Sequence, residues 1–222
     1  MKKILVVAPH PDDEMIGVGG TIIKNIAEGN EVYVVIVTKG MSPLFDPAII
    51  EKTRGEARRC HKKIGIKKTY FLDFPSTMLD TTPKYKLNGA IFDVMKEVMP
   101  TEVYIPYSGD MHFDHGIVAE AAMVAMRPKY SFAPEKIYIY ETLSETGWNT
   151  PEENKKFSPN VFVDISKYID QKLDVISIYE SQFEEFPATR SIQAVHALAE
   201  YRGVLANVCA AESFMLAREV IK

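Results

Sequence analysis

The stretch KILVVAPHPDDEMIGVGGTIIKNIAEGNEVYVVIVT, residues 3–38, decides the fold. Residues 3–8 are rich in Val and Ile, a pattern typical of a central parallel strand that is buried on both faces. Residues 15–28 place isoleucines near one helical face and are followed by Gly29, which predicts a helix with a glycine stop. Residues 31–38 predict a second buried strand. This strand, helix and strand form one βαβ unit, which almost always crosses over right-handedly.

The same alternation continues outward from this unit. Further strands are expected at 69–73, 102–106, 136–141 and 161–166, and further helices at 47–64, 87–99 and 116–125. From about residue 167 the chain is expected to be mainly helical. Strands that alternate with helices predict an α/β protein with a doubly wound, mostly parallel sheet and flanking helices. At 222 residues the chain suits a single domain that spans residues 1–222.

Charge and hydropathy narrow the class of partner. The net charge is −4, and the densest basic clusters are the pairs at 58–59 and 62–63, so the electrostatic footprint of a nucleic-acid-binding protein is missing. No apolar run reaches the roughly 18 residues of a membrane span. The apolar run after Lys2 and Lys3 extends only from Ile4 to Pro9, too short for a secretory signal. We therefore expect a cytoplasmic protein with a small-molecule partner.

The cysteines do not point to a covalent framework. Cys60 and Cys209 are the only two in the chain, and they are far apart without a CxxC motif. This usage argues against a disulfide scaffold and against a thiolate metal site.

Polar residues follow two of the expected strands. His10 to Glu14 comes after the first strand, and YSGDMHFDH, residues 107–115, comes after the strand that ends near Pro106. Ligands of parallel sheets bind beyond the carboxyl ends of the strands, so the two loops can converge. Three of the five histidines of the chain lie in these loops: His10, His112 and His115.

These residue types suit a hydrolytic zinc site. Such a site uses about three His, Asp or Glu ligands and leaves one position for water. His10, Asp13 and one histidine of the second loop supply that set, and Asp12 is then left beside the metal rather than on it. A free carboxylate in that place can take the proton of the water. A turn at Pro11 lets the two neighbouring aspartates point in different directions.

A simpler interpretation exists for each segment alone. Acidic residues 12–14 could be helix-capping and first-turn acids, which the helix dipole favours. His112 and His115 could be surface residues at a helix start. The coincidence of both segments at two strand ends favours the functional interpretation.

Other candidate motifs are weaker. GVGG, residues 17–20, lacks the spacing of a phosphate-binding loop, and we interpret its glycines as sites of close helix packing. ESQ, residues 180–182, has no glycine elbow around its serine. His61 and His196 fall in helical segments and are expected to be structural or exposed.

Several motifs together resemble a known family. PHPDDE (9–14), HFDH (112–115) and RGEARRCHKKIGI (54–66) are similar to motifs of the PIG-L or LmbE-like family of metal-dependent N-deacetylases, with fainter echoes in KLDVISIYESQF (172–183) and AESF (211–214). The resemblance implies a Rossmann-like α/β fold. It also implies removal of the acetyl group from an N-acetylglucosamine-type sugar or glycoside, with Zn²⁺ or another divalent ion such as Fe²⁺.

The resemblance also implies roles for individual residues. The implied metal ligands are His10, Asp13 and His115, and the implied general base is Asp12. His112 would stabilise the oxyanion or act as an acid, Asp114 would orient His112, and Arg54 would lie near the substrate. The chain departs from the common family pattern at Phe113, where many members have Pro, and at Pro9, where many have Ala. Neither change removes a ligand or a proton-transfer group.

Two alternative functions stay open at this level. One is a metal-dependent amidase that acts on another N-acyl group or on a thiol conjugate. The other is a non-catalytic sugar- or metal-binding protein of the same fold. The long loops at 74–86 and 142–160 are expected to form the substrate walls, and a homo-oligomer is compatible with the sequence.

Overall fold

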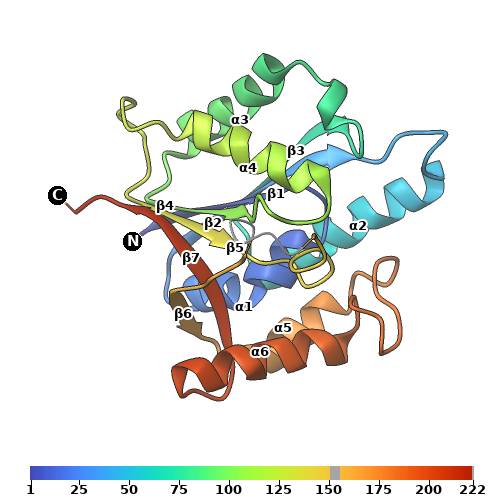
Figure 1. Ribbon diagram of the computed structural model, residues 1–222, viewed down its shortest axis with the longest axis vertical. Helices are drawn as coiled ribbons and strands as arrows, with labels where there is room; N and C mark the ends of the chain where they lie inside the picture. Colours follow the sequence, from blue (N-terminus) through green and yellow to red (C-terminus); the bar gives the residue numbers. More distant parts are fainter. Residues whose placement is uncertain (151–155, 222) are drawn as a thin grey trace.

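A seven-stranded sheet in the order β3-β2-β1-β4-β5-β7-β6 runs through the computed structural model, which describes residues 1–150 and 156–221 (Figure 1). The strands are β1 (Lys3–Ala8), β2 (Glu31–Lys39), β3 (Lys68–Pro75), β4 (Glu102–Pro106), β5 (Lys136–Tyr140), β6 (Val161–Asp164) and β7 (Ala211–Glu219). The helices are α1 (Asp13–Ala27), α2 (Pro47–Ile64), α3 (Lys84–Val98), α4 (Phe113–Ala125), α5 (Ile169–Ile176) and α6 (Ile192–Ala206), with a short 3-10 helix η1 (Leu79–Thr81).

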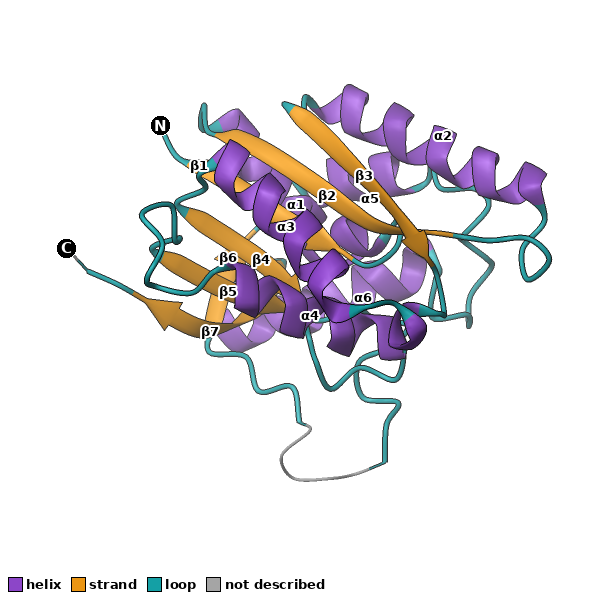
Figure 2. Cartoon of the chain, turned by 90° about the horizontal axis from the view of Figure 1, so that it is seen from above, coloured by secondary structure: helices purple, strands orange, loops and turns teal. Residues whose placement is uncertain are grey.

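The sheet is covered by helices on both faces, as predicted. Helices α3 and α4 lie on one face, and α1, α2, α5 and α6 lie on the other (Figures 1 and 2). Strand β1 shows why its sequence is apolar throughout, because Ile4 and Val6 pack into the core on the α1 side while Leu5 and Val7 pack into the core on the α3 side. The predicted α/β fold with a mostly parallel sheet is therefore confirmed.

The topology brings the two polar loops together. From β1 the chain moves outward through β2 to β3, and then returns to the other side of β1 to form β4 and β5, all parallel. The point where the strand order reverses therefore lies between β1 and β4. Open parallel sheets bind ligands at the carboxyl ends of the strands at such a point, and the loops that follow β1 and β4 both start there.

The C-terminal part differs from the sequence-based expectation. Helices α5 and α6 are present, but the chain ends in β7, which lies between β5 and β6 and is antiparallel to both. Residues 211–219 (AESFMLARE) contain Ala, Glu, Leu, Met and Arg, which favour helix, so local propensity conceals the strand. Tertiary pairing with two neighbouring strands overrides that preference.

The two long loops are shorter than predicted or only partly described. In the segment 74–86, β3 extends to Pro75, η1 occupies Leu79–Thr81, and α3 begins at Lys84. The predicted loop at 142–160 includes residues 151–155, which lie outside the described residues. Among the helices that the structure describes, none combines the length and the apolar character needed to cross a bilayer. Cys60 is buried and Cys209 is exposed, and neither forms a disulfide.

The C-terminal segment contacts the middle of helix α1. The backbone N–H groups of Gly20 and Thr21 each donate to the carboxylate of Glu212 at 2.7 Å, and Lys172 Nζ donates to the carbonyl oxygen of Ile16 at 2.8 Å. Lys172 also bonds Glu212, at 2.7 Å, and both side chains are buried. The faint motifs at 172–183 and 211–214 therefore hold the helix that carries the first polar loop.

The glycines of GVGG allow close packing, as predicted. A Cβ atom on Gly17 would lie 2.4 Å from the ring of Tyr140 and 2.7 Å from the carbonyl oxygen of Glu141. A Cβ atom on Gly20 would lie 2.7 Å from Ile165. Helix α1 consequently lies against β5 and the segment after β6 at a distance that larger residues would not permit.

Candidate active site

The loop after β1 separates two adjacent aspartates. Asp12 has φ 122°, a backbone conformation that is rare outside glycine, and α1 begins at the next residue. The Asp12 side chain does not cap the helix. Asp13 Oδ2 instead accepts the backbone N–H of His10 at 2.9 Å. The turn therefore directs the two carboxylates into different surroundings, and the helix-capping interpretation fails for both.

Three candidate metal ligands from the two loops meet at one point. Potential ligand atoms of His10, Asp13 and His115 all lie within 4.8 Å of one another. Asp13 Oδ2 lies 3.2 Å from His10 Nδ1 and 3.3 Å from His115 Nε2. Both Asp13 and His115 are 0% exposed. Within the described residues, Asp13 Oδ1 accepts no hydrogen bond, and His115 Nε2 has no hydrogen-bond partner apart from its 3.3 Å approach to Asp13 Oδ2. Buried polar atoms are costly when unpaired, so this donor set suits a divalent cation.

The other ring nitrogen of each histidine is held by a carboxylate. His115 Nδ1 lies 2.8 Å from Asp110 Oδ2, and His10 Nε2 lies 3.0 Å from Asp114 Oδ2. Histidines that bind metals usually donate their second N–H in this way, which fixes the ring and makes the ligand more basic. A second group of potential ligands, His10 with His112 and Asp114, overlaps the first group. The buried unpaired atoms at Asp13 and His115 favour the first group.

Asp114 contacts different partners from those that the resemblance implied. Its carboxylate is bonded to His10 and accepts the backbone N–H of Thr77 at 2.8 Å. Its own backbone N–H donates to His112 Nδ1 at 3.2 Å. Asp114 therefore orients His112 through its main chain, and its side chain orients the candidate ligand His10. Both contacts arise because α4 begins at Phe113, three residues earlier than predicted.

Asp12 has the properties of a proton acceptor. Its side chain is 1% exposed and lines a cavity, and neither carboxylate oxygen has a hydrogen-bond partner among the described residues. Burial raises the pKa of Asp12 to about 7, against the opposing effect of Arg190, whose Nη1 lies 3.6 Å from Asp12 Oδ2. A carboxylate with such a pKa can both take and return a proton near neutral pH.

His112 is placed as a neutral hydrogen-bond donor. Burial and the nearby His10 lower the pKa of His112 to about 4. Because its Nδ1 accepts the N–H of Asp114, a neutral His112 carries its proton on Nε2. That N–H is available to an oxyanion in the cavity that His112 lines.

Glu14 is a buried residue that holds the first loop in place. It is 0% exposed, and its Oε1 accepts the Tyr179 hydroxyl at 2.5 Å and lies 2.9 Å from His61 Nε2. Its Oε2 accepts the backbone N–H of Asp12 at 3.2 Å. Glu14 is thus a buried anchor rather than a first-turn surface acid. The structural interpretation of His61 is confirmed, and His196 lies at the surface beside Glu200.

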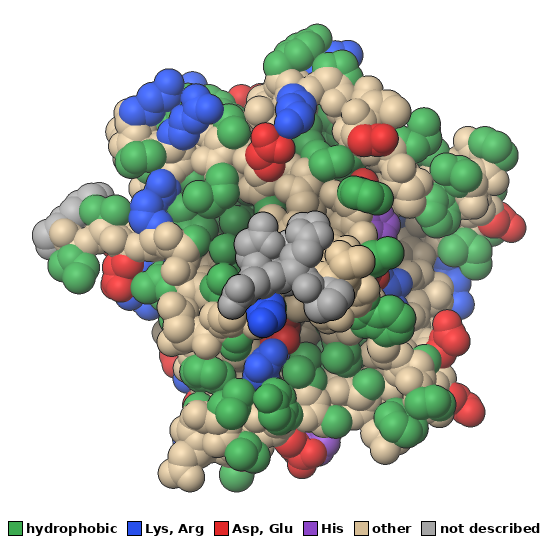
Figure 3. Space-filling model, viewed as in Figure 1, with side chains coloured by type: hydrophobic (Ala, Val, Ile, Leu, Met, Phe, Trp, Pro, Cys, Tyr) green, Lys and Arg blue, Asp and Glu red, His purple; other side chains and the backbone are tan. Residues whose placement is uncertain are grey.

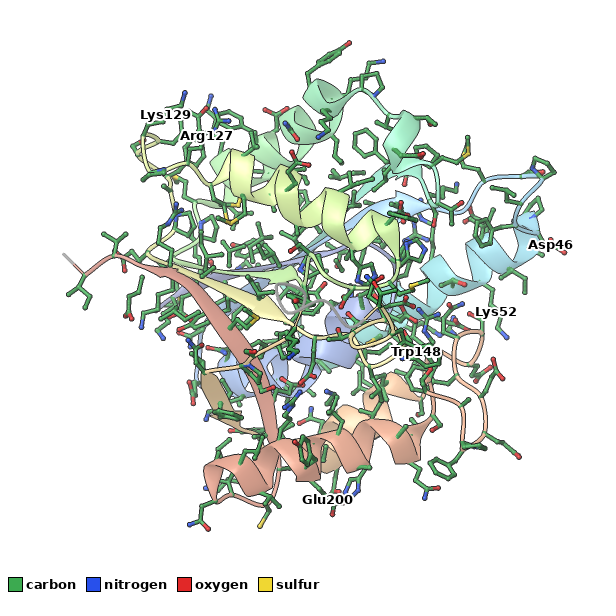
Figure 4. The ribbon with its side chains drawn as sticks, viewed as in Figure 1. Asp46, Lys52, Arg127, Lys129, Trp148 and Glu200 are labelled. Atoms are coloured by element: carbon green, nitrogen blue, oxygen red, sulfur yellow. The ribbon has the colours of Figure 1, made fainter. Side chains whose placement is uncertain are left out.

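The cavity beside Asp12 has a volume of ≈ 280 Å³ and is lined by residues of both loops, α2 and the segment before α6. Arg54 of α2 lines it, as expected for a substrate-binding residue, and its guanidinium is paired with Asp73 and lies 4.4 Å from the ring of Phe71. In Figure 4, the start of α2 (Asp46, Lys52) and Trp148 lie at this end of the sheet, whereas Arg127 and Lys129 lie at the other end.

Two residues of the site were missed from the sequence. Asp110, which holds His115, lies in the second polar loop, and its place two residues before His112 was an available signal. Arg190, near Asp12, lies in the irregular segment between α5 and α6. No local pattern marks Arg190, because the fold brings it to the site from far along the chain.

Comparisons with known proteins match more than half of the chain. The family model described as PIG-L, GlcNAc-PI de-N-acetylase, matches residues 5–126, more than half of the chain. A diacetylchitobiose deacetylase of Thermococcus kodakarensis is 30% identical over 198 residues, which cover 83% of this chain and 72% of that protein.

Solved structures share the fold. The N,N'-diacetylchitobiose deacetylase of Pyrococcus horikoshii superposes with a TM-score of 0.78 at 25% identity, covering 97% of this chain and 83% of that one. A 4-carboxy-2-hydroxymuconate hydratase of Pseudomonas putida also superposes with a TM-score of 0.78, at 20% identity, covering 100% of this chain and 98% of that one. The fold alone is therefore compatible with more than one reaction. The residues of the site must distinguish between these reactions.

Proposed function

Because this chain belongs to the PIG-L family of deacetylases, we propose that it is a zinc-dependent hydrolase of an N-acetylglucosamine-type sugar or glycoside, releasing acetate and a free amine. Its class, a hydrolytic N-deacetylase that acts on N-acetylated sugars, follows from its relatives. The metal and the particular acetamido sugar are parts of the proposal. A cytoplasmic location and a homo-oligomeric state stay predictions.

The proposal assigns the metal to His10, Asp13 and His115. Two imidazoles and one carboxylate match the ligand set of catalytic zinc sites, and Fe²⁺ is an alternative with similar ligands. When bound, the ion polarises the amide carbonyl group and makes water a better nucleophile at neutral pH. The buried, unpaired atoms of Asp13 and His115 support this assignment.

The remaining residues supply the proton transfers. Asp12 takes a proton from the attacking water as the new C–O bond forms. The Nε2–H of His112 donates a hydrogen bond to the oxygen of the former carbonyl group, which becomes negatively charged. Asp12 then returns its proton to the amide nitrogen as the C–N bond breaks. Acetate and a free amino group are the products, and Asp12 is ready for the next cycle.

Arg54 is proposed to bind the sugar. Its pairing with Asp73 and its contact with Phe71 hold the guanidinium in one orientation at the cavity wall. A fixed guanidinium donates to hydroxyl oxygens, and the neighbouring carboxylate accepts from hydroxyl groups. Together they suit the hydroxyl groups of an amino sugar ring.

One observation carries the proposal: a buried carboxylate, Asp12, lies free of hydrogen bonds beside a trio of metal-capable side chains. A structural acid would be expected to accept hydrogen bonds, whereas the cation nearest to Asp12 among the described residues, Arg190, lies 3.6 Å away.

The test is a screen for released amine. Metal-stripped protein, with and without added Zn²⁺ or Fe²⁺, is incubated with N-acetylated amino sugars and their glycosides, and free amine is quantified. Metal-dependent release from acetyl substrates is the expected result. Release only from longer N-acyl groups or thiol conjugates would favour the amidase alternative, and binding without release would favour the non-catalytic one.

A further inference from the structure

A second cavity adjoins the first one at His112. It has a volume of ≈ 500 Å³, and it shares Thr77, His112 and Glu145 with the cavity beside Asp12. The two cavities are therefore parts of one cleft that passes over a catalytic residue. The described lining of the second part includes neither Asp12 nor any of the three residues to which the metal is assigned, so this part has room for a group that does not react.

The wall of this second cavity is apolar and exposed. Phe113 is 85% exposed and Met111 is 53% exposed, and both line the cavity together with Ile117. Phe113 and Met111 flank His112 in the chain. Large apolar side chains that are exposed together at a cleft indicate a binding surface rather than a solvated one. In Figure 3, hydrophobic side chains surround the hollow in which a histidine is visible.

The charge of the second cavity restricts what it can bind. Asp80, Asp114 and Glu145 line it, and among its described lining residues there is no lysine or arginine. Asp114 is paired with His10, and Glu145 lies 4.0 Å from Arg190 Nη2, so Asp80 is the carboxylate that makes the local potential negative. An anionic group would be repelled here, whereas a neutral apolar group gains contact with Phe113 and Met111.

The position of the reacting amide identifies the occupant. The amide must lie beside Asp12 and His10, in the first cavity, where Arg54 also binds the sugar in the proposed function. Beyond its carbonyl group an acetyl group has only a methyl group, which cannot fill a cavity of ≈ 500 Å³. The part of the substrate that extends past His112 is then the group attached to the sugar. We propose that the second cavity is an aglycone subsite for a neutral aryl or alkyl group, an inference that rests on the proposed deacetylase function.

The test uses three glycosides of N-acetylglucosamine, which carry a methyl, a phenyl or a 4-carboxyphenyl aglycone. For each glycoside, kcat/KM is measured from the release of amine. We expect the phenyl glycoside to exceed the methyl glycoside by about tenfold, the size of a modest apolar contact. Phe113→Ala and Met111→Ala should each reduce this ratio by about threefold or more. Because the measurement is the ratio of two kcat/KM values, a loss of activity that affects both glycosides equally leaves it unchanged.

A matched control and a charge variant sharpen the test. Met123→Ala, at the other end of α4, should keep the wild-type ratio, since Met123 is partly exposed but lines neither cavity. The 4-carboxyphenyl glycoside should be a poorer substrate than the phenyl glycoside, and Asp80→Asn should narrow that difference.

Two results would overturn the subsite. One is deacetylation of all three glycosides with equal kcat/KM, unaffected by Phe113→Ala. The other is a Phe113→Ala effect confined to substrates with a longer N-acyl chain, such as hexanoyl, which would place the acyl group in the second cavity. Failure of the proposed function is distinguishable from both, because no acetamido sugar would then release amine.

Discussion

Asp12 and Asp13 are adjacent in the chain and yet differ in every property that matters for catalysis. Asp13 lies between His10 and His115, and these two histidines hold its pKa well below the ordinary value even though burial acts in the opposite direction. Burial raises the pKa of Asp12, and the opposing effects of Arg190 and His10 are smaller. The backbone turn at Asp12 creates this difference. Asp13 therefore stays charged beside a cation, whereas Asp12 can exchange a proton.

This division predicts different effects of two substitutions. Asp12→Asn should keep the bound metal and lower kcat by about 10²- to 10⁴-fold, the usual range for loss of a general base. His115→Ala should lose both metal and activity. Metal content by elemental analysis and amine release are the two measurements. Equal metal loss in both variants would show that Asp12 is a ligand instead of a base.

Arg190 should control the pH at which Asp12 becomes active. Its positive charge favours the carboxylate form, so Arg190→Gln raises the pKa of Asp12 further and moves the acid limb of the kcat/KM profile to higher pH. The loss of activity should be larger at pH 6 than at pH 9. Arg190→Lys, which keeps the charge, should restore the profile partly, and Arg127→Gln at the other end of the sheet should leave it unchanged. An unshifted limb in Arg190→Gln would exclude this role.

At the scale of elements, α1 is the helix on which the site depends. It carries Asp13 at its first turn, and the buried pair of Lys172 and Glu212 forms hydrogen bonds with its middle. A buried carboxylate that accepts two backbone N–H groups and an ammonium group is fully satisfied. Helix α5 and strand β7 thereby hold α1 in place, although both lie more than 140 residues away along the chain.

The close packing of α1 can be tested by comparing substitutions at two glycines, one in α1 and one in α3. Gly17→Ala places a Cβ atom against Tyr140 and the backbone of Glu141, so we expect a loss of about 1–3 kcal/mol in the free energy of unfolding. Gly89→Ala on α3 meets nothing within 4 Å and should stabilise the protein by about 0.5–1 kcal/mol, because Ala favours helix. Urea unfolding measures both. A neutral Gly17→Ala would mean that α1 can shift without cost.

At the scale of the whole molecule, the site joins two loops that are about one hundred residues apart. Without a metal, Asp13 and Asp110 outweigh the effect of burial and raise the pKa of His115 to about 10. This raised pKa stabilises the metal-free fold fully below pH 6.5, and the stabilisation is lost as the pH rises through about 10. A metal must displace the same proton, so its apparent affinity increases with pH.

Thermal unfolding should report this linkage. Zn²⁺ at 1,000 times its dissociation constant stabilises a protein by about 4 kcal/mol, so we expect a clear rise in Tm on metal addition. The rise at a fixed Zn²⁺ concentration should be larger at pH 8 than at pH 6. His115→Ala should show no rise at either pH. A rise that is independent of pH would argue against proton displacement from His115.

Much of the fold could be predicted because its information is local. Strands β1 and β2 are apolar on both faces, and this pattern is expected for a strand that is covered by helices on both sides of the sheet. The meeting of His10, Asp13 and His115 could be predicted because they occur at the ends of strands whose order in the sheet makes them neighbours. Strand β7 could not be predicted, because its helix-favouring residues adopt a strand only through pairing with β5 and β6.

The sequence by itself determined a doubly wound α/β domain and two polar loops whose histidines and carboxylates could hold a metal ion. Only the tertiary structure decided which partners these residues have: the Asp114 carboxylate with His10 rather than His112, Asp110 with His115, and Arg190 with Asp12. The physical reason is that periodicity and turn chemistry act over a few residues, whereas charge pairing acts through space. The chain order contains no direct record of which distant side chains a fold brings within 4 Å.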